Sequence, residues 1–367
     1  LTIIISTFFH LAEGSVLSPI SPILDSFEWY LRGAIIILFV SGMRNLTSQD
    51  IITISKVYIF SCVFIAIVAV LQALQIDSYL LKKFLSFYAP GREGERMLYS
   101  ISGRYSSILG QPVSYGIFFL FGISILLFYG ERIIYSRLIR YLIFLFIFFT
   151  SFLSISKVIL IGIPILILSR IFLAITFFVK LRFEDYLCLF LFLLAGLFLT
   201  SDSNIFAAEH LYNNYKNFTA IFDIINHAFY ARFVTTDFGY EGLIVADWSV
   251  FKDNLLFGIG WTQADRVVKL GDSGYVPILV RSGILGMFFY VVYLLSIFGT
   301  SFFSLRKNFG LKDPVAMNYL FLFFISLIFA VGTPIFYIDR SSDFFWMLSA
   351  IAIAIIKKKM PNSTDKD

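Results

Sequence analysis

The residues that could carry chemistry lie in and beside two long polar stretches, about residues 77–111 and 201–275. The second stretch ends near Asp272 and Ser273, and Arg281 follows several residues inside the next apolar run. A carboxylate at such a boundary can act as a general base toward a hydroxyl, or it can cap the helix that begins there. An ionisable residue inside an apolar span is costly and marks a functional site by default, unless it extends to the interface. The sequence leaves both alternatives open for each residue.

Basic side chains collect in the same two stretches and at the short turn before residue 158. Arginine stays charged and binds phosphate oxygens through two parallel hydrogen bonds, so this gathering suits an anionic ligand. Contact with lipid headgroups is the alternative role for each of these side chains. In the two long stretches they include Lys82, Lys83, Arg92, Arg96 and Arg104, and Lys216, Arg232, Lys252, Arg266 and Lys269.

The second polar stretch has the pattern of a folded cap. Residues 240–252 carry apolar side chains at helical spacing, which predicts an amphipathic helix. The segment Gly258-Ile259-Gly260 follows, and glycines two apart suit a tight turn in which the backbone approaches another segment closely.

Composition excludes a soluble enzyme. The 367 residues are 59% hydrophobic and 14% charged, whereas soluble domains are about 45–50% apolar and about 25% charged. The net charge of +5 comes mostly from basic residues at the ends of apolar runs, where they set topology and do not indicate nucleic acid. Cys62 and Cys188 both lie in apolar runs, which argues against a disulfide framework. No group of His, Cys and Asp has metal-ligand spacing, so we expect no metal site.

A hydrocarbon core requires about 20 apolar residues per helix, and this length predicts an all-α polytopic membrane protein with about ten or more transmembrane helices. The predicted spans are 1–12, 31–43, 52–76, 112–129, 138–154, 158–179, 186–200, 276–304, 315–337 and 342–356. Because the first span is short and begins at Leu1, not at Met, we expect that the true N-terminus is missing.

The short basic loops set the orientation. All of them fall on one side, which the positive-inside rule makes cytoplasmic. They lie at Arg44, 131–140, 180–182, 306–308 and 357–359. We therefore expect four parts, which are N-terminal helices over 1–200 with an outer loop at 77–111, a large outer loop at 201–275, C-terminal helices over 276–356 and a cytoplasmic tail at 357–367.

Three ordered blocks carry a family resemblance. The first is Ser102-Gly103-Arg104 with Gly110-Gln111-Pro112, and the second is Ser154-Ile155-Ser156-Lys157. The third runs from Arg232 through Trp248 and the segment 253–260 to 272–275 and 283–286. Together, over about residues 50–300, they resemble the O-antigen polymerase/ligase superfamily of bacterial membrane glycosyltransferases. The ligase branch usually has His-Asn where this chain has Asp272-Ser273, so the chain looks more like the polymerases.

The resemblance implies a GT-C-like fold and a reaction at the outer face of the bacterial cytoplasmic (inner) membrane. In that reaction an undecaprenyl-diphosphate-linked glycan is transferred to a sugar hydroxyl. Arg232 and Arg104 are then the first candidates for diphosphate binding, and Lys157 and Arg281 are the second. Asp272 is the candidate base, and Tyr240 and Trp261 are candidates for stacking on sugar rings or for packing the cap. We expect no cofactor.

The expected partners are the lipid-linked glycan donor and acceptor and the membrane lipid, with a chain-length regulator protein as a further candidate and no nucleic acid. Three other interpretations remain, which are a ligase, a polysaccharide or small-anion transporter, and a non-catalytic scaffold. Gly162 and Pro164, which interrupt one apolar span, favour the transporter. We find no internal repeat, and that favours the enzyme.

Overall fold

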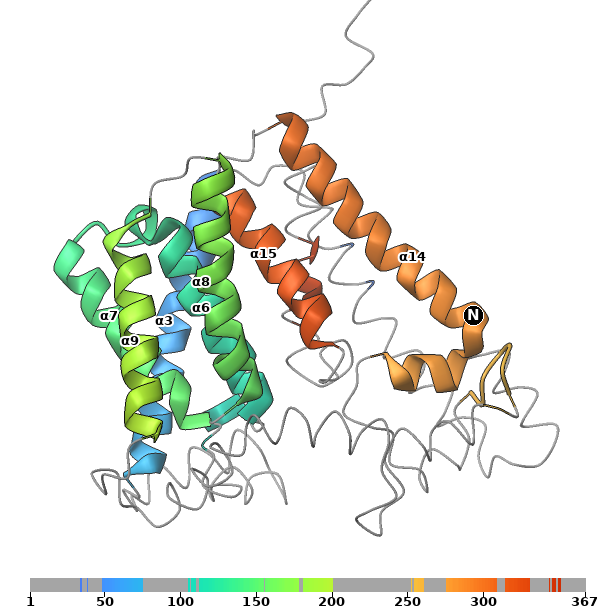
Figure 1. Ribbon diagram of the computed structural model, residues 1–367, viewed down its shortest axis with the longest axis horizontal. Coiled ribbons are helices and arrows are strands. Elements are labelled where there is room, and N and C mark those ends of the chain that lie inside the picture. Colours follow the sequence, from blue (N-terminus) through green and yellow to red (C-terminus); the bar gives the residue numbers. More distant parts are fainter. Residues whose placement is uncertain are drawn as a thin grey trace, which may run out of the picture. The chain divides into compact units, whose positions relative to one another are not determined.

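The computed structural model of the chain describes helices throughout the part that it covers, with no strand among the described residues (Figure 1). The described residues are 34, 38, 48–74, 105, 107–109, 112–154, 156–177, 181–200, 252, 254–260, 275–308, 314–330, 343, 345–347, 349 and 350. Five of the described helices are long and apolar enough to cross a membrane, namely Gln49–Ala73, Pro112–Ile133, Arg137–Ser154, Val158–Ile175 and Ile278–Ser296. The prediction of a helical membrane protein is confirmed at this level. The predicted spans 1–12, 31–43 and 342–356 lie wholly or mostly outside the described residues.

The chain divides into two compact units, each described here by itself. The α6 unit contains α3 (Ser48–Ala73), η1 (Ser107–Leu109), α6 (Pro112–Ile133), α7 (Arg137–Ser151), η2 (Phe152–Ser154), α8 (Lys157–Phe177), α9 (Phe183–Thr200) and the first part of α15 (Pro314–Phe329). The α14 unit contains the turn at residues 254–260, most of α14 (Val276–Asn308) and the end of α15.

Helix α6 is the centre of its unit. Every residue from Ser114 to Gly130 is buried, whereas less than half of the membrane-length window in each of α3, α7 and α8 is buried inside the protein. A helix that is apolar on all sides is expected to be buried by its neighbours, and α3, α7 and α8 pack against α6. The exposed apolar side chains of these outer helices then suit contact with lipid.

Hydrogen bonds between buried side chains join three helices of this unit. The Ser55 hydroxyl on α3 lies 2.8 Å from the Tyr129 hydroxyl on α6. Ser124, also on α6, donates to the Asn318 side-chain oxygen on α15. Polar side chains of this kind hold helices together in a medium that offers no water. Helix α6 leaves helical geometry at Tyr129, where φ is −145° and ψ is 26°.

One expectation about helix continuity is wrong. Helix α8 runs from Lys157 to Phe177 through Gly162 and Pro164, so these residues do not interrupt it. Proline is tolerated inside a membrane helix because neighbouring groups take up the freed backbone atoms. Helix α14 covers the predicted span 276–304 and leaves helical geometry at Gly283.

The close packing of α6 against α8 predicts a sensitive glycine. A Cβ atom at Gly116 would lie 2.6 Å from the Ser156 Oγ and 2.8 Å from the Ser156 Cβ. We expect Gly116→Ala to lower the free energy of unfolding by about 1–3 kcal/mol, the usual cost of overpacking. Thermal unfolding in detergent measures the change. Gly299→Ala is the matched control because nothing lies within 4 Å of a Cβ there, and an equal effect of both substitutions would contradict the prediction.

Candidate functional site

The predicted site residues are unevenly covered by the structure. Arg104, Arg232, Tyr240, Trp261 and Asp272 lie outside the described residues. Lys157 is the first residue of α8. Arg281 lies in the first part of α14 and is buried. The candidate site is therefore built from Arg281 and the segments around it.

Helix α14 is broken two residues after Arg281. At Gly283 the backbone has φ 66° and ψ −173°, a combination that essentially only glycine adopts. The chain turns sharply at this point, so that a short segment over 276–282 precedes a long one (Figure 1). Such a break frees carbonyls on its N-terminal side and amides on its C-terminal side, and these groups need other partners.

The turn at residues 254–260 supplies those partners. The Ile259 and Gly260 amides donate to the Val280 and Arg281 carbonyls at 2.9 and 3.0 Å. The Ile284 and Leu285 amides donate to the Leu255 and Leu256 carbonyls at 2.9 and 3.3 Å. We call residues 254–260 together with residues 280–285 the clamp. Non-helical backbone at membrane depth is tolerated where protein satisfies it, and the clamp does so on both sides of the break.

The two halves of the clamp touch through their backbones. A Cβ atom at Gly258 would lie 2.5 Å from the Arg281 carbonyl carbon and 2.5 Å from the Gly283 nitrogen. A Cβ atom at Gly283 would lie 2.6 Å from the Phe257 nitrogen. Gly258 and Gly260 have positive φ angles of 73° and 61°. The close backbone approach expected at Gly258-Ile259-Gly260 is therefore present, and its counterpart is the break in α14.

Arg281 is enclosed by protein at this junction. Its relative exposure is 9%, and its neighbours Val280 and Ser282 are both 2% exposed. The Ser282 hydroxyl donates to the Ile278 carbonyl at 2.6 Å within the short segment. A side chain that served only as an interfacial anchor would be exposed to headgroups, whereas Arg281 is enclosed by protein.

Tyr275 ties the start of α14 to the end of α15. Its hydroxyl donates to the Leu327 carbonyl at 2.8 Å. Burial raises the pKa of Tyr275 to about 12, so the phenol stays neutral and keeps its proton for this bond at physiological pH. The short segment that carries Arg281 is thus held at Tyr275 as well as at the clamp.

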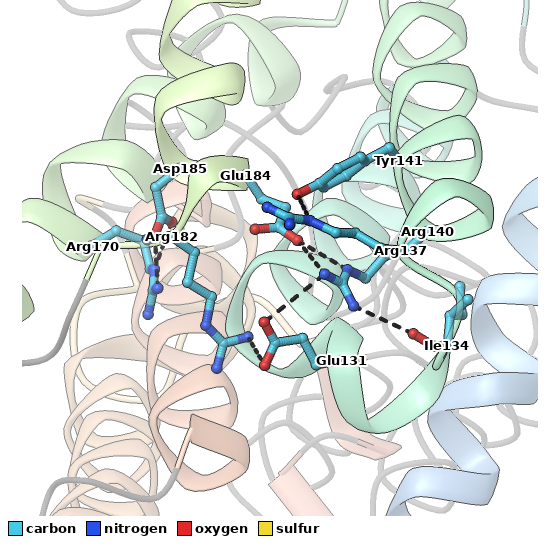
Figure 2. Close-up of polar contacts among 9 residues, drawn as sticks. All are labelled: Glu131, Ile134, Arg137, Arg140, Tyr141, Arg170, Arg182, Glu184 and Asp185. Carbon is cyan, nitrogen blue, oxygen red and sulfur yellow. Dashed lines mark hydrogen bonds and ion pairs between the residues drawn. The ribbon is translucent and has the colours of Figure 1, made fainter.

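A second polar cluster joins α6, α7, α8 and α9, and sequence reasoning did not foresee it (Figure 2). Arg140 binds the Glu184 carboxylate at 2.8 Å, and Arg170 binds both oxygens of Asp185 at 2.8 and 2.9 Å. All four side chains are at most 7% exposed. Glu131 at the end of α6 extends the cluster toward Arg182, at 3.6 Å. A signal was present, because Arg170 lies inside an apolar span and an acidic pair opens the next helix.

The contacts of this cluster indicate a structural role. The Arg170 guanidinium also lies 4.8 Å from the centre of the Phe128 ring. Asp185 accepts a further hydrogen bond from the Arg182 amide at 2.8 Å, close to the first turn of α9. Buried charges are stable only when they are paired and hydrogen-bonded, and here each one has its partner within the bundle. The cluster holds four helices together, whereas Arg281 lies beside the break in helix α14.

In the described part of the chain, no three His, Cys, Asp or Glu side chains gather as a metal site would require.

Comparisons with family models, with curated proteins and with solved structures find no match for this chain.

The buried ion pairs lead to a prediction about stability. Arg170→Met leaves the Asp185 carboxylate buried without its partner, and we expect a loss of about 3–5 kcal/mol in the free energy of unfolding. Adding Asp185→Asn removes the second charge while it keeps an acceptor for the Arg182 amide. The double variant should recover most of the loss in chemical unfolding experiments. A double variant less stable than Arg170→Met alone would show that charge pairing is not what stabilises this cluster.

Proposed function

We propose that this chain is a bacterial membrane glycosyltransferase that polymerises undecaprenyl-diphosphate-linked oligosaccharide repeat units at the outer face of the cytoplasmic membrane. One observation carries the proposal. Two pieces of the third resemblance block, at 253–260 and 283–286, are hydrogen-bonded to each other, and a buried arginine lies between them. The two pieces lie more than 20 residues apart in the chain, so their pairing supports the idea that they serve one site.

The reaction requires little covalent chemistry from the protein. The acceptor hydroxyl oxygen bonds to the anomeric carbon of the donor while the bond from that carbon to the diphosphate oxygen breaks. The hydroxyl proton passes to Asp272 as the general base, and undecaprenyl diphosphate leaves. Negative charge develops on the departing diphosphate, and arginine stabilises it in a site that excludes water. In this proposal Arg232, Arg104, Lys157 and Arg281 divide that task, and no metal ion takes part.

The proposal includes an architecture beyond the described helices. It has about ten spans, with the stretch 201–275 forming a cap on the outer side and the loops at 131–140 and 180–182 facing the cytoplasm. The ion-pair cluster then lies on the cytoplasmic side, because Glu131, Arg140 and Arg182 belong to those loops. Arg281 lies close to the start of α14, which follows the proposed outer stretch in the chain.

A transporter of polysaccharide or of a small anion is the second candidate. The specific observation in its favour is the break in α14, because discontinuous helices form the binding sites of many transporters. The uninterrupted course of α8 removes the feature that first supported this interpretation. The ligase remains a variant of the enzyme proposal, with a different acceptor.

The decisive experiment uses purified protein in nanodiscs with a synthetic undecaprenyl-diphosphate-linked repeat unit. We expect the wild type to give a ladder of products resolved by size. Arg232→Ala and Asp272→Ala should abolish the ladder, because the first loses a charge for the diphosphate and the second loses the base. Arg137→Ala is the control, since Arg137 is exposed and lies at the start of α7.

The opposite result separates the candidates. A folded wild-type protein that gives no ladder with the correct repeat unit would contradict the polymerase proposal. Movement of the same lipid-linked unit across the bilayer of a proteoliposome would then establish the transporter.

A further inference from the structure

We infer that Gly258 and Gly283 are positioning residues for Arg281, and that the clamp aims the Arg281 guanidinium at the diphosphate of the lipid-linked donor. The inference rests on the proposed function, because that function supplies the anionic ligand. It adds a device that the reaction scheme does not contain. Gly258 and Gly283 carry no functional group, yet they would determine how well Arg281 binds the diphosphate.

The backbone at Arg281 is held by hydrogen bonds to the turn at residues 254–260. The carbonyls of Val280 and Arg281 both accept hydrogen bonds from the turn, at 2.9 and 3.0 Å. Beyond the break, the amides of Ile284 and Leu285 are held in the same way. The backbone on both sides of the arginine is therefore fixed to one short segment.

Neither Gly258 nor Gly283 can be replaced without moving Arg281. The Cβ of any other residue at Gly258 would overlap the Arg281 carbonyl carbon and the Gly283 nitrogen. The Cβ of a residue at Gly283 would overlap the Phe257 nitrogen, and the backbone there would be strained as well. In both cases the overlap is with backbone, which cannot turn aside as a flexible side chain can. The turn and the short segment must separate, and Arg281 moves with the segment.

A small displacement of the Arg281 guanidinium would weaken the binding of an anion. Arginine binds phosphate through a planar fork of donors, and this geometry tolerates little misplacement. A shift of about 1 Å at a binding group can lower the rate about 100-fold. The effect is large where water is excluded, and Arg281 is only 9% exposed. The close backbone contact at Gly258 and Gly283 would therefore fix the position of the Arg281 guanidinium.

The test compares four variants by binding of undecaprenyl diphosphate in nanodiscs and by KM and kcat for the lipid-linked repeat unit. Arg281→Gln should weaken binding and raise KM about tenfold or more, and Arg281→Lys should recover part of the loss because it keeps the charge. Gly283→Ala should weaken binding to a similar extent although it retains the arginine. Gly299→Ala is the control on the same helix, where the added methyl group meets open space, and it should match the wild type.

A double-mutant cycle separates positioning from general stability. If the glycine acts through the arginine, Gly283→Ala combined with Arg281→Gln should bind no more weakly than Arg281→Gln alone. If the two losses multiply, Gly283 acts only on the fold and the inference is overturned. Should Gly283→Ala fail to fold, Ile259→Ala replaces it in the cycle. That variant keeps the backbone amide but removes a buried side chain from the turn.

Two further outcomes distinguish this inference from the proposed function. Inorganic pyrophosphate should compete with the lipid in the wild type, which would identify the diphosphate group as the part that Arg281 recognises. Binding of undecaprenyl diphosphate that depends on Arg281, without a product ladder, would overturn the polymerase and support the site. A ladder from the wild type with unchanged binding and KM in folded Arg281→Gln would support the polymerase and overturn the site.

Discussion

The four hydrogen bonds between residues 254–260 and the break in α14 are the interactions on which the candidate site depends. A helix that is broken in a membrane leaves polar backbone groups that water cannot reach, and each one costs free energy until it finds a partner. The clamp provides those partners from a segment that comes before α14 in the chain. Without it, the short segment with Arg281 would have no reason to depart from the helix that follows.

The two units satisfy buried polar groups in different ways. In the α6 unit, side chains do so, through pairs such as Arg170 with Asp185 and Ser55 with Tyr129. These contacts join helices that are themselves regular and hold them in fixed positions. In the α14 unit, the backbone does so at a point where the helix is interrupted. The first arrangement fixes separate helices to one another, and the second fixes the two sides of a break within one helix.

The helices of the α6 unit could be predicted from the sequence because they depend on local properties. The apolar runs at 52–76 and 112–129 became α3 and α6 within a few residues, since span length follows from the thickness of the bilayer. The glycines at 258 and 260 likewise indicated a close approach of backbone. The break at Gly283 could not be predicted, because glycine in an apolar run also occurs in continuous membrane helices. What decides the outcome there is a hydrogen-bonded partner more than 20 residues away. The pairing of Arg140 with Glu184 could not be predicted from the sequence either, because the two residues lie far apart in the chain.

The composition of the turn has a consequence for how this protein can change over evolutionary time. The clamp is made of main-chain atoms, and the side chains of Leu255, Leu256 and Phe257 are exposed, at 46%, 65% and 41%. Substitutions at these three positions therefore leave the hydrogen bonds of the clamp intact. The neighbouring Gly258 is constrained, because a Cβ atom there would overlap backbone atoms. Descendants of this chain can alter the surface beside Arg281 while the arginine stays in place. The main-chain geometry of the clamp is thus retained while the exposed side chains of the turn change.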